Sequence, residues 1–157
     1  MSLNAFVQKL SQKYKSNINY NSSLVLSEIF APFGSAAGAY AFTRLNLNNY
    51  LSSSIGGVAG NYISAVAVFG TAWYLFNRKW YSGNARKFFK DFGEMTAKNL
   101  VPAALSYLLF TPISLWLAYE TFKPDEAAFY ASILSALIFI GGSNIANQRI
   151  IKSYRSS

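Results

Sequence analysis

Four apolar segments, each about as long as a bilayer is thick, constrain the fold of this chain more than any other feature. About 20 helical residues cross the hydrocarbon core of a membrane. The segments lie at about residues 26–45, 55–76, 100–119 and 127–147, and the last three contain no Asp, Glu, Lys or Arg. Because an unpaired backbone amide in lipid is costly, spans of this kind must be helical. The sequence therefore predicts an all-α fold with four transmembrane helices.

The composition supports a membrane location. Charged residues make up 13% of the chain, against roughly 25% in ordinary soluble domains. A soluble bundle with buried helices is the alternative, and the long uncharged runs argue against it. The chain has no Cys and no His. It therefore lacks disulfides, thiolate chemistry and the commonest general base and metal ligand.

The positive charges predict the topology. All fourteen Lys and Arg except Arg44 and Lys123 precede the first span, lie between the second and third, or follow the fourth. The positive-inside rule places those segments in the cytoplasm. We therefore predict one polytopic domain over residues 1–157, in the plasma or cytoplasmic membrane, with both termini cytoplasmic.

Two cytoplasmic segments have apolar side chains at helical spacing beside Lys and Arg. They are an N-terminal helix at about residues 2–16 and the loop at residues 78–98. This pattern predicts amphipathic helices that lie on the membrane surface and bind anionic lipid. The same apolar faces would also suit contact with a partner protein.

Small residues at fixed spacing predict close helix contacts within the membrane. Glycines permit close approach of two helix backbones. Intramolecular packing and an oligomer interface are both compatible with these positions. The glycines are Gly34, Gly38, Gly56, Gly60, Gly141 and Gly142.

Polar residues at membrane depth are candidates for a functional site. Asn61 lies in the second segment and Asn144 in the fourth, whereas Glu28 lies near the cytoplasmic boundary of the first, where it could pair with Lys98 or an interfacial Arg. An ionisable residue inside a membrane is a functional hypothesis by default.

No two acids share a span, and nucleotide-binding and hydrolase motifs are absent. We therefore predict no catalytic residues, no metal, no cofactor and no enzymatic activity.

The end of the second span has the sequence Asn77-Arg78-Lys79-Trp80. Cations and an aromatic ring suit a cytoplasmic membrane interface. With four spans and cytoplasmic termini, this motif resembles the GtrA-like small membrane proteins, and Asn147 with Arg149 matches a related motif more loosely. The resemblance implies a role in moving or anchoring polyprenyl-phosphate-linked sugars for cell-surface glycan synthesis. Asn77, Arg78, Lys79, Trp80 and Arg149 would then bind the lipid phosphate.

Other functions remain open from the sequence. A His-free, Cys-free bundle with packing glycines would also suit an accessory subunit of a larger membrane complex. A channel for a small neutral solute is a further alternative, whereas the lack of a buried charge in the later spans argues against proton coupling. The +8 charge follows topology and no nucleic-acid-binding module is present, so we expect no nucleic-acid partner. The expected partners are membrane lipids, and further copies of the chain or a larger complex.

Overall fold

The computed structural model describes residues 3–153, and for residues 3–14, 16, 17, 144 and 146–153 it describes the backbone alone. Within residues 3–153 the chain is helical apart from short connections, with no strand. The elements are α1 (Leu3–Arg44), α2 (Asn49–Leu51), the π-helical turn η1 (Ser52–Gly56), α3 (Gly57–Tyr81), α4 (Ala85–Lys98), α5 (Leu100–Tyr119) and α6 (Pro124–Ser153).

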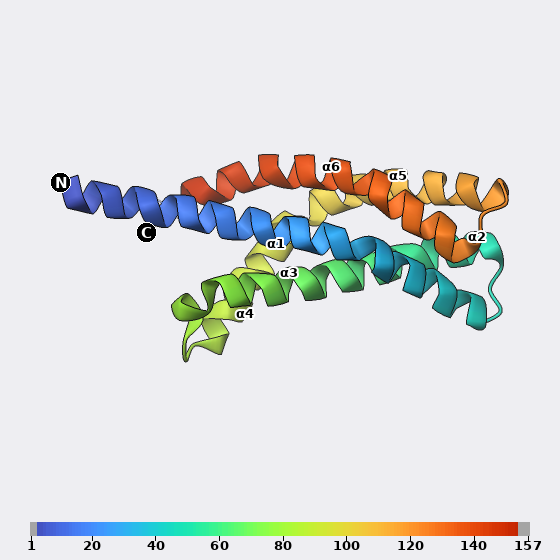
Figure 1. The fold of residues 1–157 in the computed structure, drawn as a ribbon, viewed down its shortest axis with the longest axis horizontal. Helices are drawn as coiled ribbons and strands as arrows, with labels where there is room; N and C mark the ends of the chain where they lie inside the picture. Colours follow the sequence, from blue (N-terminus) through green and yellow to red (C-terminus); the bar gives the residue numbers. More distant parts are fainter. Residues whose placement is uncertain (1–2, 154–157) are drawn as a thin grey trace.

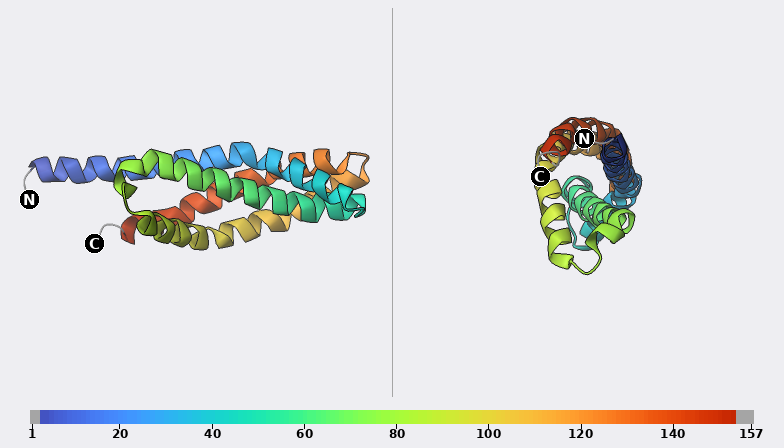
Figure 2. Two further views of the ribbon diagram at one scale, coloured as in Figure 1. Left: turned by 90° about the horizontal axis from the view of Figure 1, so that it is seen from below. Right: turned by 90° about the vertical axis from the view of Figure 1, so that its left-hand side faces the viewer.

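The long helices run up and down along one axis (Figure 1). α1 packs against α3 and α6, and α5 packs against α6, whereas α3 and α5 contact each other little. Figure 2 shows α4 at the same end of the bundle as the described start of α1 and the described end of α6. The α1–α2 and α5–α6 connections lie at the opposite end.

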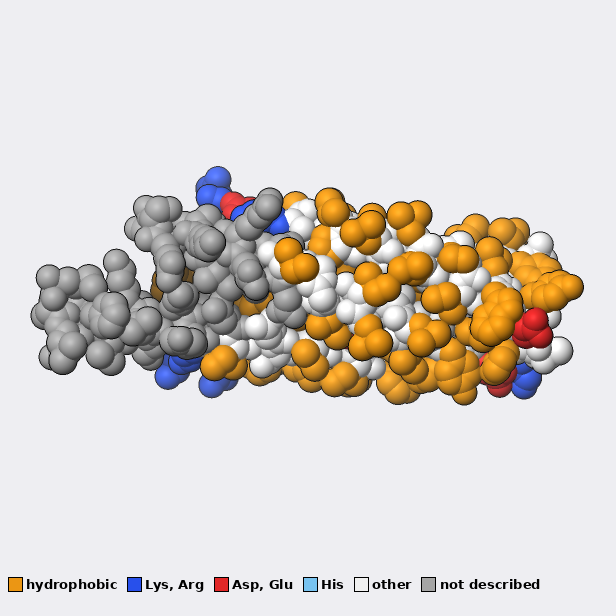
Figure 3. Space-filling view, turned by 90° about the horizontal axis from the view of Figure 1, so that it is seen from above, with side chains coloured by type: hydrophobic (Ala, Val, Ile, Leu, Met, Phe, Trp, Pro, Cys, Tyr) orange, Lys and Arg blue, Asp and Glu red, His pale blue; other side chains and the backbone are white. Residues whose placement is uncertain are grey.

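Four helices are long and apolar enough to cross a membrane, which confirms this part of the prediction. By length and composition they are Ile18–Arg44, Asn49–Tyr81, Leu100–Tyr119 and Pro124–Ser143. Figure 3 shows hydrophobic side chains over the middle of one face and charged side chains near its ends. A long basic segment that includes α4 joins the second and third of these spans, and a short connection with Glu120 and Lys123 joins the third and fourth.

The N-terminal segment differs from the expectation. The predicted surface helix at residues 2–16 and the first span form one uninterrupted helix of 42 residues, which begins at Leu3. The intervening polar residues do not end it, because their side chains find partners. Ser23 Oγ donates to the Asn19 carbonyl at 2.8 Å, and Asn19 Nδ2 donates to Asn77 Oδ1 in α3 at 2.9 Å. Such bonds satisfy polar groups inside a helix pair without breaking either helix.

The glycines of α1 pack against Gly56, the last residue of η1, and Gly60 of α3. A Cβ atom on Gly60 would overlap the Gly34 carbonyl oxygen, and one on Gly38 would overlap the Gly56 carbonyl oxygen. The two helix backbones therefore touch along this seam. In α6 the two glycines differ: Gly142 lies against Pro102, whereas a Cβ on Gly141 would meet open space.

Serine side chains replace large apolar ones along much of the interior. Ser35 Oγ donates to the Gly57 carbonyl at 3.0 Å and lies 3.1 Å from the Ala128 carbonyl oxygen, which links α1, α3 and α6. Ser53 Oγ in η1 donates to the Ser114 carbonyl at 3.0 Å. In a bilayer, bonds of this kind and close backbone contact associate helices that have no hydrophobic driving force between them.

Candidate functional site

The predicted motif lies where α3 leaves its helical path. Asn77 has non-helical backbone angles, φ −116° and ψ 15°. Its side chain is held within the protein, because Oδ1 accepts from Asn19 Nδ2 and Nδ2 donates to the Trp73 carbonyl at 2.9 Å. Asn77 thus fixes the kink and the α1–α3 contact. The role of Asn77 in phosphate binding stays a prediction.

The next three residues of the motif point outward. Arg78, Lys79 and Trp80 are exposed, with Trp80 at 64% of its possible area. The ammonium of Lys87 in α4 lies 4.0 Å from the centroid of the Trp80 ring. This cation–π contact holds the start of α4 beside the end of α3. We call Arg78 and Lys79, together with Arg86, Lys87 and Lys90 of α4, the basic end.

A hydrogen-bonded network orients α4 against α3. Trp73 Nε1 donates to Tyr81 Oη at 2.9 Å, and Tyr81 Oη donates to Asp91 Oδ2 at 3.1 Å. The Phe88 ring packs edge-on to Tyr74 at 5.3 Å and to Tyr81 at 5.4 Å. These polar and aromatic side-chain contacts fix the position of α4 against α3, in addition to the loop that joins the two helices.

An apolar groove runs between α3 and α4 beside the basic end. Its volume is about 810 Å³. Three phenylalanines of α4 line one side, and Gly70 and Tyr74 of α3 line the other. The groove, which we call the α3–α4 groove, is formed by Val66, Ala67, Gly70, Thr71, Tyr74, Tyr81, Gly83, Asn84, Ala85, Phe88, Phe89 and Phe92.

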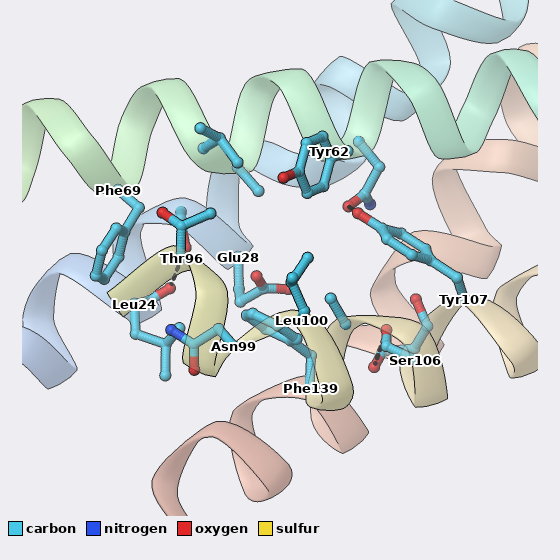
Figure 4. Close-up of a pocket in the computed structure, with 16 residues that line it drawn as sticks. Leu24, Glu28, Tyr62, Phe69, Thr96, Asn99, Leu100, Ser106, Tyr107 and Phe139 are labelled. Carbon is cyan, nitrogen blue, oxygen red and sulfur yellow. Dashed lines mark hydrogen bonds between the residues drawn. The ribbon is translucent and has the colours of Figure 1, made fainter. Parts of the chain in front are cut away.

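A second, smaller cavity lies deeper in the bundle. Its volume is about 60 Å³, which is room for a few water-sized groups. Figure 4 shows the Glu28 side chain of α1 in its centre, between Tyr62 of α3 and Leu100 of α5. Phe69, Tyr107 and Phe139 form much of its apolar wall. We call this space the Glu28 cavity.

Hydrogen bonds occupy several polar groups of the Glu28 cavity. Asn61 Nδ2 donates to Ser132 Oγ at 2.5 Å, and Tyr107 Oη donates to Asn61 Oδ1 at 3.3 Å. Asn99 Nδ2 donates to Tyr20 Oη at 2.8 Å. Asn61 therefore links α3 to α5 and α6, and Asn99 links the start of α5 to α1.

The structure brings together some of the predicted residues and not others. Glu28 and Asn61 share one cavity, and Arg78 with Lys79 shares the basic end with α4. Glu28 has no ion pair or hydrogen bond with any residue whose side chain the structure describes, Lys98 included. The predictions for the side chains of Asn144 and Arg149 lie outside the described residues.

Sequence reasoning predicted Asn61 but missed Tyr62, Thr96 and Asn99, which also line the cavity around Glu28. Tyr20, Leu24, Ser27 and Glu28 recur at spacings of three and four, which places them on one face of a helix. On α1, that spacing could have indicated from the sequence that these four residues face the same site. No comparable signal marks Tyr62 or Thr96, because aromatic and hydroxyl residues occur on every face of these helices.

Three comparisons with known proteins give no guide to the site. The chain matches no family model, no curated protein and no solved structure. Among the described residues, no group of three Asp, Glu, His or Cys is placed to hold a metal ion. The features of the protein that bear on its function are therefore the basic end, the α3–α4 groove and the Glu28 cavity.

Proposed function

We propose that this chain is a multi-pass integral membrane protein whose basic end binds a polyprenyl phosphate, and that it moves or anchors polyprenyl-phosphate-linked sugars for cell-surface glycan synthesis. In this proposal both termini and the basic end face the cytoplasm, as the charge asymmetry favours. α4 then lies at the membrane interface, with Phe88 and Phe92 directed to the bundle and its cations to lipid head groups. The resemblance of the α3 end to GtrA-like proteins points to the same ligand class.

One observation supports this ligand more than any other: residues that line the α3–α4 groove stand beside cations in the sequence, as Ala85 does beside Arg86 and Tyr81 does near Arg78 and Lys79. The groove offers Phe88, Phe89 and Phe92 to an isoprenoid chain. Arg78 and Lys79 stand exposed at the end of α3, which Tyr81 and the groove adjoin. An amphiphile with one long apolar chain and a phosphate matches both features, because Arg and Lys bind phosphate through charge-assisted hydrogen bonds.

Equilibrium binding of radiolabelled undecaprenyl phosphate to the full chain in mild detergent tests the ligand. A cation near a membrane surface contributes about 1 kcal/mol to binding an anionic lipid. We therefore expect the double variant Arg78→Gln, Lys79→Gln to bind roughly 30-fold more weakly than the wild type. Undecaprenol, which lacks the phosphate, should bind both proteins equally.

A matched control has the same change of charge at the other end. Arg44→Gln with Lys123→Gln also removes two cations, and should leave the affinity for undecaprenyl phosphate unchanged. Equal weakening by the two pairs would mean that only net charge matters, which would contradict a site at the basic end.

The role in glycan synthesis needs a cellular measurement. In cells that depend on this chain, Arg78→Ala with Lys79→Ala should abolish surface glycan output although the protein still inserts into the membrane. Undiminished output would contradict the proposed role. Co-purification of the wild type with a much larger membrane assembly, with no retained polyprenyl phosphate, would instead favour an accessory subunit.

A further inference from the structure

The Glu28 cavity contains a carboxyl group that the proposed phosphate site does not use. Glu28 of α1 projects into a space bounded by α3, α5, the end of α4 and Phe139 of α6 (Figure 4). It lies in the helix segment Ile18–Arg44, one of the four segments long and apolar enough to cross a membrane. A carboxyl at such a depth is costly unless a partner compensates it.

Three oxygen-bearing groups of this cavity form no hydrogen bond with the residues whose side chains the structure describes. Within the part of the chain whose side chains the structure describes, the Glu28 carboxyl, Tyr62 Oη and Thr96 Oγ1 take part in no hydrogen bond or ion pair. The adjacent amides of Asn61 and Asn99 are already bonded to Ser132 and Tyr20. The cavity thus presents a carboxyl group, which as a carboxylate only accepts hydrogen bonds, and two hydroxyl groups, each of which can accept as well as donate.

The cavity opens sideways between α3 and α5. These two helices contact each other little, whereas α1 and α6 form its back. At the rim, Tyr62 retains 39% and Leu100 retains 52% of its possible exposed area. A ligand can therefore reach Glu28 along the surface that faces lipid, without passing through the bundle.

At one end the cavity reaches the junction of α4 and α5. Thr96 and Asn99 line the cavity at the junction of α4 and α5, and the apolar span of α5 begins at Leu100. Glu28 lies eight residues further along α1 than Tyr20, whose hydroxyl is bonded to Asn99, so the cavity runs from the level of this junction into the bundle, where the carboxyl group lies. A lipid head group can reach this level from the neighbouring leaflet while its acyl chains remain in the hydrocarbon core.

We propose that the Glu28 cavity binds the primary ammonium group of an aminolipid, which enters between α3 and α5. A carboxylate attracts the cation, and the three N–H groups of an ammonium can be shared among Glu28, Tyr62 and Thr96. The faces of Phe69, Tyr107 and Phe139 add cation–π attraction. A quaternary ammonium has no N–H to donate, so it would leave the hydroxyl oxygens unsatisfied.

Competition between two lipids tests this proposal directly. The full chain, in mild detergent with equimolar phosphatidylethanolamine and phosphatidylcholine of identical acyl chains, would be analysed by native mass spectrometry. The wild type should retain phosphatidylethanolamine with a preference of about tenfold, as expected for a charge-assisted hydrogen bond. Both lipids carry the same phosphate, so the result does not depend on Arg78, Lys79 or the proposed function.

Glu28→Gln keeps the shape of the side chain and removes its charge, so this variant should lose the preference. Glu120→Gln, which changes an exposed acid in the α5–α6 connection, should keep it. If Glu28→Gln fails to fold, Tyr62→Phe and Thr96→Val decide the question, because each removes one acceptor and should lower the preference about threefold.

Three results would overturn the proposal. They are equal retention of the two lipids by the wild type, an unchanged preference in all three cavity variants, and retention of a protein chain in place of the aminolipid at this opening.

Discussion

At the scale of single residues, the glycines of α1 and α3 set how closely the two helices approach. The seam formed by Gly34, Gly38, Gly56 and Gly60 has no room for a methyl group on either helix. Tight backbone contact of this kind also brings Ser64 Oγ within 3.2 Å of the Phe30 carbonyl, to which it donates. In a lipid environment such contacts supply much of the association energy between helices.

Gly60→Ala should therefore destabilise the bundle. The added Cβ would overlap the Gly34 backbone, which has no flexible side-chain end to move aside. Forcing α1 and α3 apart should cost about 1–3 kcal/mol, the usual range for overpacking. Reversible unfolding of the full chain in mixed micelles would measure this change.

The matched control is Gly141→Ala, where the new Cβ meets open space. Alanine is the better helix former, so this variant should be neutral or more stable by up to about 1 kcal/mol. Equal losses at the two positions would show that the α1–α3 seam is not as tight as described.

Predictions from the sequence were least complete for individual residues. Glu28 and Asn61 are conspicuous because polar residues are rare in these segments, and the structure brings them into one cavity. The contact of Asn77 with Asn19 was not predicted, since the sequence could not show that the two residues lie opposite each other. Tyr62 and Thr96 line the cavity because of how their helices are rotated and because α3 and α5 contact each other little. Both features depend on tertiary packing, so the sequence alone could not predict them.

At the scale of elements, α4 is the one helix whose placement depends on a few specific contacts. It joins α3 through the Trp73–Tyr81–Asp91 network and through Phe88. The four long helices, by contrast, are specified by apolar length, which is why their existence could be predicted. The continuity of α1 could not, because a run of Asn and Ser resembles a connection until its partners in α3 are known.

Tyr81→Phe should loosen α4 without unfolding the bundle. The change removes the hydroxyl that bridges Trp73 and Asp91 and keeps the ring that packs on Phe88. Local opening of α4 should become more frequent, because hydrogen bonds of this type each contribute about 0.5–1.5 kcal/mol.

Hydrogen exchange measured by mass spectrometry would report this loosening as faster exchange in Ala85–Lys98, with Leu100–Tyr119 unchanged. Tyr119→Phe, at a residue that is 73% exposed, is the control and should leave exchange in α4 as in the wild type. Unchanged exchange in the Tyr81→Phe variant would mean that the network does not position α4.

At the scale of the whole molecule, the two ends of the bundle differ in charge and in the sites that they carry. The α3–α4 groove and the basic end include residues of α4, and the Glu28 cavity reaches Thr96 of α4. Figure 1 shows that α4 lies at one end of the bundle. The opposite end carries few cations, namely Arg44 and Lys123. Both ligand proposals therefore require that the α4 end face the leaflet that supplies the lipid.

Cysteine labelling tests that orientation most directly, because the chain has no Cys of its own. Ser82→Cys marks the exposed α3–α4 connection, and Glu120→Cys marks the exposed α5–α6 connection. In intact cells, a membrane-impermeant maleimide should label Glu120→Cys and should label Ser82→Cys only after permeabilisation. Labelling of Ser82→Cys in intact cells, or of both variants alike, would contradict a four-span bundle with its basic end in the cytoplasm.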